Sequence, residues 1–221
     1  MSVATEITWI PSQDYLDQSR LLAFARASGV DGYEGLCEWA ARDPGAYWDA
    51  VVRDLGFEFD PGYDKPVDFQ RGKEWPEWFP GAGFDYVSSI FALAEKRGQL
   101  DELAVIWEGD GGDTRSLTFA QLWSETKRFA NGLEKAGIGK GDRLGIFLPM
   151  IPETVVAVLA TGLVGAIYIP MFSGYGAEAV ASRLRDCDAK MLITANGFHR
   201  RGKLVPLDHY RRRVRAELGL S

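Results

Sequence analysis

Three short apolar segments alternate with two helical segments between residues 143 and 194, and this alternation restricts the fold more than any other feature. The apolar segments Arg143–Leu148, Ala166–Ile169 and Lys190–Thr194 have the length of strands. The segments between them, 153–164 and 177–187, have the length and periodicity of helices. Such a succession of buried strands and helices packs as a parallel sheet with helices on both faces. The sequence therefore predicts an α/β fold.

The first 86 residues predict a different structure, an irregular and mostly helical cap. Helical periodicity runs through residues 14–28, from about Tyr33 to Ala40, and through residues 44–55. Between Phe57 and Phe84, proline, glycine and aromatic residues replace this periodicity, so we expect an extended loop that its aromatic side chains attach to a neighbouring surface. We assign four tryptophans to the packed core of the cap: Trp39, Trp48, Trp75 and Trp78.

The remaining segments complete the predicted order of elements. We expect a helix at Val87–Arg97, two short strands at Ala104–Glu108 and Arg115–Thr118, and a long helix at Phe119–Lys135 that Thr118 caps. The predicted domains are residues 1–86, 87–207 and a basic tail at 208–221. The arginines of this tail, between residues 211 and 215, predict a charged helix that frays at the chain end.

Composition excludes several classes of protein. With 221 residues and 46% hydrophobic side chains, the chain can bury a globular core. A formal net charge of -6 argues against a dedicated nucleic-acid binder. No apolar stretch approaches the roughly 20 residues that cross a bilayer, and the N-terminus has no secretory pattern, so we expect a cytoplasmic protein that binds no membrane. Cys37 and Cys187 are far apart in sequence, and we interpret both as reduced core thiols.

A basic segment follows the third apolar strand and is the main candidate for a binding site. Asn196 and Gly197 end the strand, and Arg200, Arg201 and Lys203 follow, with Gly202 among them; these four residues form the basic turn. Cations and a glycine at the carboxyl end of a parallel strand can hold a polyphosphate. A solvated basic loop is the alternative interpretation of the same residues.

Other kinds of site are not indicated. The sequence contains neither the G-x-S-x-G elbow nor the G-x-x-x-x-G-K-[ST] phosphate loop, and no glycine fingerprint opens a helix after a strand. His199 and His209 are the only histidines, and no acidic or cysteine cluster stands at metal-ligand spacing. We therefore predict no metal site and no catalytic residue, and we expect His199 to lie at the surface or at the edge of a slot.

These residues together resemble a known family. The chain from Leu117 to Leu207 resembles the early part of the large domain of AMP-forming acyl-CoA synthetases, in the acetyl-CoA and acetoacetyl-CoA synthetase branch. The motifs that carry the resemblance are KGDR at Lys140–Arg143, PMIPE at Pro149–Glu153, VGA at Val164–Ala166, FSGY at Phe172–Tyr175 and AKMLIT at Ala189–Thr194. The upstream cap is similar to the N-terminal cap of the same branch. The fold implied is an incomplete version of the adenylate-forming large domain, about the first third of a family member.

The resemblance implies a ligand for two turns of the chain. In this family a carboxylate attacks the α-phosphate of ATP, with Mg²⁺, to give an acyl-adenylate, and the thiol of coenzyme A (CoA) then displaces AMP. By resemblance the basic turn, Arg200, Arg201, Gly202 and Lys203, binds CoA, and the turn Phe172, Ser173 and Gly174 lines the same slot. Two residues depart from the family pattern: Arg201 stands where the family often has a small residue, and Ser173 stands where it more often has glycine. The alternative for Phe172–Gly174 is a tight connection in which Gly174 only permits unusual backbone angles.

The same resemblance places the ATP loop, the acyl pocket and the catalytic lysine outside these 221 residues. We therefore expect this chain alone to lack ligase activity. Three alternatives stay open: a CoA-binding module, one half of a split synthetase that pairs with a second polypeptide, and a non-functional product of an early stop or frameshift. The sequence does not define which carboxylic acid is activated.

Overall fold

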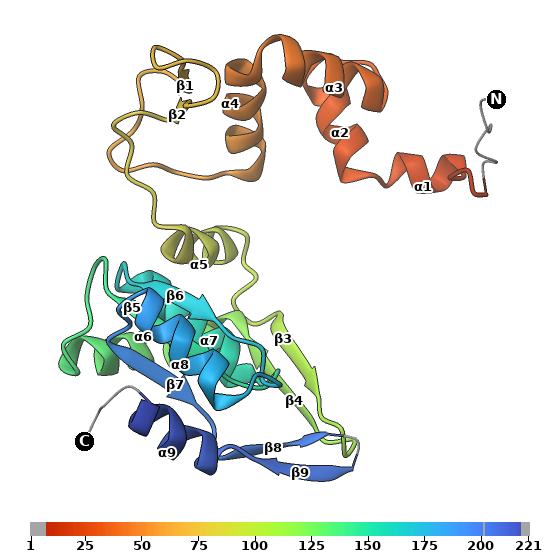
Figure 1. Cartoon of the computed structure of the whole chain (residues 1–221). Coiled ribbons are helices and arrows are strands. Elements are labelled where there is room, and N and C mark those ends of the chain that lie inside the picture. Colours follow the sequence, from red (N-terminus) through yellow and green to blue (C-terminus); the bar gives the residue numbers. More distant parts are fainter. Residues whose placement is uncertain (1–7, 201, 218–221) are drawn as a thin grey trace, which may run out of the picture. The chain divides into compact units, whose positions relative to one another are not determined.

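A computed structural model describes residues 8–200 and 202–217, and the chain divides into two compact units, residues 1–84 and 85–221 (Figure 1). The first unit begins with helices α1 (Gln13–Asp17), α2 (Arg20–Ala27), α3 (Gly32–Arg42) and α4 (Pro44–Leu55). Helix α4 starts as its sequence predicts, because the Asp43 side chain accepts a hydrogen bond from the Ala46 amide and Pro44 occupies the first turn. Phe24, Ala25 and Leu36 are buried between these helices.

Aromatic rings organise the irregular part of this unit. Only two-residue strands, β1 (Val67–Asp68) and β2 (Glu77–Trp78), pair there, in antiparallel register. The Phe59 ring lies 5.2 Å from Tyr63 and 5.0 Å from both Phe79 and Phe84, measured between centroids. The aromatic side chains thus pack mainly against one another. The predicted attachment to a neighbouring surface is seen at Trp78, whose ring lies 6.3 Å from that of Trp48 in α4.

Two predictions about buried side chains are wrong. Trp39 packs beside the α2–α3 core, but Trp48, Trp75 and Trp78 are exposed. Cys37 is also exposed, because it lies on the outer side of α3, and Cys187 is only half-buried. Sequence composition shows that these side chains are apolar, but it does not show which face of a helix or loop they occupy.

The second unit contains the predicted parallel sheet. Strands β5 (Arg143–Phe147), β6 (Ile167–Pro170) and β7 (Met191–Thr194) lie in the order β6-β5-β7, and both outer strands run parallel to β5. Gly145 in the centre pairs with Ile169 on one side and Leu192 on the other. The α/β fold with a parallel sheet is therefore confirmed.

Helices cover both faces of this sheet (Figure 1). On one face, Leu144 packs with residues of α6 (Phe119–Lys135) and α7 (Pro152–Leu163). On the other face, Phe147 packs with α8 (Ala177–Asp186). Helix α6 begins with a capping box, in which Thr118 and Gln121 each accept a hydrogen bond from the other's amide. Helix α5 (Tyr86–Lys96) packs on α7 through the cluster around Val87 and Phe91.

Polar contacts fasten the amino ends of β5 and β7. The Lys190 ammonium lies 2.5 Å from the Asp142 carboxylate, which lowers the pKa of Asp142, as does the Gly139 amide that donates to it. The Arg143 guanidinium donates to the carbonyl oxygens of Cys187 and Asp188, at 2.7 and 3.1 Å. These bonds hold the end of α8 against the start of β5.

Two antiparallel hairpins flank the sheet. The first pairs β3 (Leu103–Glu108) with β4 (Thr114–Thr118), as predicted. The second pairs β8 (Gly197–Arg200) with β9 (Lys203–Pro206), and sequence analysis did not predict it.

The chain ends in α9 (Asp208–Glu217), which packs on α8. Val214 is 2% exposed in this packing, so the prediction of a frayed helix is wrong. Among the described residues, no helix is both long and apolar enough to cross a membrane.

Removing one buried side chain of β5 tests this arrangement. Leu144 has no exposed surface, so we expect Leu144→Ala to lower the free energy of unfolding of residues 85–221 by about 2–5 kcal/mol, from lost burial and the cavity left behind. Ile167, 51% exposed on β6, is the control, and Ile167→Ala should cost at most about 1 kcal/mol. Urea denaturation measures both, with amide exchange of β5 assigning the transition. Equal losses in the two variants would contradict the central position of β5.

Candidate functional site

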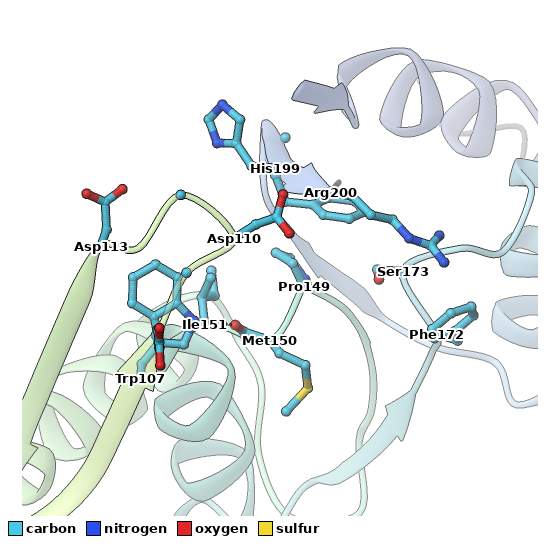
Figure 2. Close-up of a pocket in the computed structure, with 15 residues that line it drawn as sticks. Trp107, Asp110, Asp113, Pro149, Met150, Ile151, Phe172, Ser173, His199 and Arg200 are labelled. Atoms are coloured by element: carbon cyan, nitrogen blue, oxygen red, sulfur yellow. Dashed lines mark hydrogen bonds between the residues drawn. The ribbon is translucent and has the colours of Figure 1, made fainter. Parts of the chain in front are cut away.

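The carboxyl ends of β5 and β6 and the two hairpins surround a pocket of about 630 Å³ (Figure 2). Parallel strands place their carboxyl ends at one edge of the sheet, which is the usual position of ligand sites in such folds. The loops after β5 and β6 contribute Pro149–Ile151 and Phe172–Ser173. Strand β8 contributes Gly197–Arg200, and the β3–β4 hairpin contributes Trp107–Gly111 and Asp113.

The loop after β5 is fixed by two hydrogen bonds to its carbonyl groups. Trp107 Nε1 donates to the Met150 carbonyl oxygen at 2.6 Å, and Thr154 Oγ1 donates to the Pro149 carbonyl oxygen at 2.6 Å. Met150 itself is 84% exposed, so its side chain faces the open side of the site. The first hairpin therefore supports this wall of the pocket although it is more than 40 residues upstream.

An ion pair joins the same hairpin to the start of α7. Arg115 lies 2.7 Å from the Glu153 carboxylate, and both side chains are about half exposed. The hydrogen bond from Arg115 is the main reason that the pKa of Glu153 falls below its ordinary value, although partial burial opposes it.

The turn after β6 presents an aromatic ring. Phe172 is 60% exposed, and its carbonyl oxygen accepts a hydrogen bond from the Tyr175 amide at 2.9 Å. A Cβ atom at Gly174 would lie 2.6 Å from the Phe172 ring, so the ring occupies space that a side chain at Gly174 would need. Tyr175 meets the Phe172 ring edge-on and also carries the Arg183 guanidinium 4.4 Å above its own ring.

The second hairpin positions the cations. Arg200 pairs with Lys203, and Gly202 between them has φ +71°, which glycine adopts without strain. At the base of the hairpin, the Leu207 amide donates to the Asn196 carbonyl oxygen at 2.8 Å, and Leu207 is fully buried. Figure 2 shows the Arg200 side chain extending in the direction of Ser173 and Phe172.

The tips of the two hairpins are joined through an acidic side chain. The Gly202 amide donates to Asp110 Oδ2 at 2.6 Å. Asp110 lies in the β3–β4 turn, which the bond from the Gly109 amide to the Asp113 carbonyl oxygen closes at 2.7 Å. Glu108, Asp110 and Asp113 give this wall a negative charge opposite Arg200.

The structure brings together only part of the predicted site. Arg200, Phe172 and Ser173 line one pocket, and Gly202 adjoins it through Asp110. Gly174 and Lys203 do not line the pocket, although Gly174 contacts Phe172 and Lys203 pairs with Arg200. Arg201 lies outside the described residues. His199 lines the pocket edge, and Figure 2 shows its ring directed away from Arg200.

Sequence analysis missed the contribution of the first hairpin. Trp107 and Asp110 precede the basic turn by 90 residues or more, and only the turn pattern of Gly109–Asp113 is recognisable in the sequence. Within the described ranges, no group of three or more potential ligand side chains could hold a metal ion. The pocket offers a cation for an anionic group, an exposed ring for a flat group, and apolar side chains for an aliphatic chain.

Comparisons with known proteins match this unit and the preceding one to two families. Residues 92–219 match the family described as AMP-binding enzyme, and residues 33–88 match the acetyl-coenzyme A synthetase N-terminus. The match to the first family extends beyond residue 207 and into the basic tail predicted at residues 208–221.

Individual relatives give the same result. An acetyl-coenzyme A synthetase from Gemmatimonas aurantiaca is 38% identical over 176 residues, which are 78% of this chain and 26% of the relative. One from Methanothrix thermoacetophila is 32% identical over 193 residues, 87% of this chain and 29% of that protein. The structure of an acetoacetyl-CoA synthetase from Streptomyces lividans superimposes with a TM-score of 0.86 at 28% identity, covering 96% of this chain and 34% of that one. The chain thus spans about a quarter to a third of these proteins.

The ion pair beside the pocket gives a prediction for pH. We expect the carboxyl of Glu153 to titrate below its ordinary pKa of 4.5, and Arg115→Ala to return that pKa toward 4.5. Because the pKa is lowered in the folded state, the stabilisation by this pair is present above the pKa of the unfolded carboxyl and is lost as pH falls through the folded pKa. Side-chain carboxyl NMR measures the titration. Arg128→Ala, which removes the partner of Glu125, is the control; the same Glu153 pKa in both variants would refute the assignment.

Proposed function

Because the chain belongs to the AMP-binding enzyme family, we propose that it supplies the coenzyme-A-binding part of an AMP-forming short-chain acyl-CoA synthetase. The reaction has two steps. A carboxylate oxygen attacks the α-phosphorus of ATP and releases diphosphate, and the thiol sulfur of CoA then attacks the acyl carbon and releases AMP. The observation that carries the proposal is that Arg200 enters the same pocket as Phe172 and Ser173 at the carboxyl edge of the sheet.

The proposed roles follow from the chemistry of each group. Arg200 and Lys203 attract the phosphates of CoA, because charge-assisted bonds to phosphate are about twice as strong as neutral ones. Among the side chains that the structure describes, those of residues 8–200, 202–207 and 212–216, neither Arg200 nor Lys203 forms an ion pair. Arg201 and Gly202 complete the basic turn, and the Gly202 amide is a backbone donor that Asp110 accepts in this structure.

The aromatic turn fits the flat part of the same ligand. Phe172 is exposed beside the cations, and an adenine ring can stack on it. Ser173 adds a hydroxyl, and Gly174 leaves room for the Phe172 ring. The apolar surfaces of Trp107, Met150 and Ile151 suit the pantetheine chain of CoA.

ATP and Mg²⁺ would be held by a complete family member. The 221 residues include no Ser/Thr/Gly-rich phosphate loop, so we propose that this chain binds CoA without activating a carboxylate. We also propose a cytoplasmic location, a reducing compartment in which the two free thiols stay reduced.

A second polypeptide is an alternative supported by the sheet. In the described part of the chain, β6 and β7 pair only with β5, so each has an outer edge without a strand. Unpaired edges are where further strands add. A protein that supplies them would make this chain one half of a split synthetase, and size exclusion with such a partner would show a larger complex.

Substitution of Arg200 tests the binding proposal. We expect Arg200→Ala to weaken CoA binding by about 10-fold or more, because one charge-assisted bond is worth roughly 1.5–3 kcal/mol. Dephospho-CoA lacks the 3′-phosphate. If Arg200 binds that phosphate, the parent chain should bind dephospho-CoA more weakly than CoA, and Arg200→Ala should bind dephospho-CoA about as tightly as the parent does. Isothermal titration calorimetry measures the affinity of each ligand for each protein.

Arg212→Ala is the matched control for this test. It removes an exposed arginine from α9, in the same basic part of the sequence but outside the pocket. Its affinity should equal that of the parent. Binding that is absent at millimolar CoA, or equal losses in Arg200→Ala and Arg212→Ala, would refute the proposed site.

An assay for AMP tests the absence of ligase activity. The chain is incubated with acetate, ATP, Mg²⁺ and CoA, and AMP is measured by chromatography. We expect no AMP above the protein-free control, because the electrostatic stabilisation of the phosphates is missing. AMP formation that requires both acetate and CoA and is lost in Arg200→Ala would overturn this part of the proposal.

A further inference from the structure

An anionic group already contacts the tip of the second hairpin. The Asp110 carboxylate accepts the hydrogen bond of the Gly202 amide at 2.6 Å, and the acceptor of this bond is a charged group. Gly202 lies between the two cations of the hairpin, Arg200 and Lys203. The carboxylate is therefore bound where an anionic ligand of the basic turn would find its backbone donor.

We propose that Asp110 competes with the ligand: its carboxylate occupies the anion position of the basic turn until a phosphate group of CoA displaces it. This inference rests on the proposed function of the site. It assigns to Asp110 an effect on ligand affinity, with no part in the chemistry of the reaction.

The charges of the groups explain why displacement is feasible. A phosphate monoester carries up to about two negative charges and three acceptor oxygens near neutral pH, whereas Asp110 offers one charge. Asp110 forms no ion pair with Arg200 or Lys203, so a phosphate can contact two cations that the carboxylate does not use. The Asp110 carboxylate is exposed, and water solvates it after it is released.

Displacement would free the hairpin tip without disturbing the rest of the site. The β3–β4 hairpin keeps its bond from Trp107 to Met150 and its ion pair from Arg115 to Glu153. The β8–β9 hairpin remains attached at its base through Leu207. The bond between Asp110 and Gly202 is thus a link between two separately supported hairpins.

A neighbouring aspartate offers a matched control. Asp113 belongs to the same turn and lines the same pocket, but Figure 2 shows its carboxylate directed away from Asp110 and Arg200. Substitution of Asp113 removes the same charge from the acidic wall while the bond to Gly202 remains. Any difference between the two sites therefore reports the bond and not the overall charge.

The experiment measures CoA affinity of the full chain by calorimetry for the parent, Asp110→Asn, Asp110→Ala, Asp113→Asn and Asp113→Ala. We expect Asp110→Asn to bind CoA about 3-fold more tightly than Asp113→Asn, because an amide oxygen still accepts the Gly202 hydrogen bond but without charge. Asp110→Ala removes the competitor and should bind CoA about 10-fold more tightly than Asp113→Ala. Thermal melting confirms that each exposed substitution leaves the fold intact.

The outcomes separate this inference from the proposed function. The competition is supported if CoA affinity falls in the order Asp110→Ala, Asp110→Asn, parent, even if the parent binds too weakly to measure. Binding by the parent with Asp110 variants equal to or weaker than their Asp113 controls overturns the competition and leaves the CoA site standing. Absence of binding in all five proteins at millimolar CoA overturns the proposed function and the competition together.

Discussion

The parallel pairing of β6 and β7 with β5 is the constraint on which the candidate site depends. Because the three strands run in one direction, the loops that follow them emerge at a single edge of the sheet. Leu144 and Phe147 point to opposite faces of β5, and the helices that bury them fix the sheet from both sides. A shift of either outer strand by one residue would exchange the side chains on its two faces, and the loops would no longer meet.

Electrostatics distinguishes this edge from a simple basic patch. The second hairpin brings Arg200 to the pocket, while the first hairpin brings Glu108, Asp110 and Asp113 to the facing wall. Opposite charges in one pocket restrict the ligands that bind well, because an anion must lie near Arg200 and keep away from the acidic wall. The hydrogen bond from the Gly202 amide to Asp110 shows that a carboxylate of the protein itself already occupies a backbone donor of the basic turn.

Local sequence patterns predicted the sheet and its helices because each element carries its own signals. The apolar strands around Leu144, the capping box at Thr118 and the glycines that end helices are all readable within a few residues. The β8–β9 hairpin was not predictable in this way. Its turn combines charged residues with Gly202, and its support comes from the burial of Leu207 and from Asp110, 92 residues upstream of Gly202. The exposed positions of Trp75 and Cys37 likewise depend on tertiary packing, which composition does not encode.

Hydrogen exchange with and without CoA tests most directly whether the carboxyl edge of the sheet is a CoA site. The account predicts that CoA slows amide exchange in two segments, residues 172–175 after β6 and residues 197–204 of the second hairpin. Exchange in α6, on the face of the sheet away from α8, should stay unchanged. Slower exchange in α6 or in residues 8–84 alone, with both predicted segments unaffected, would contradict the central claim.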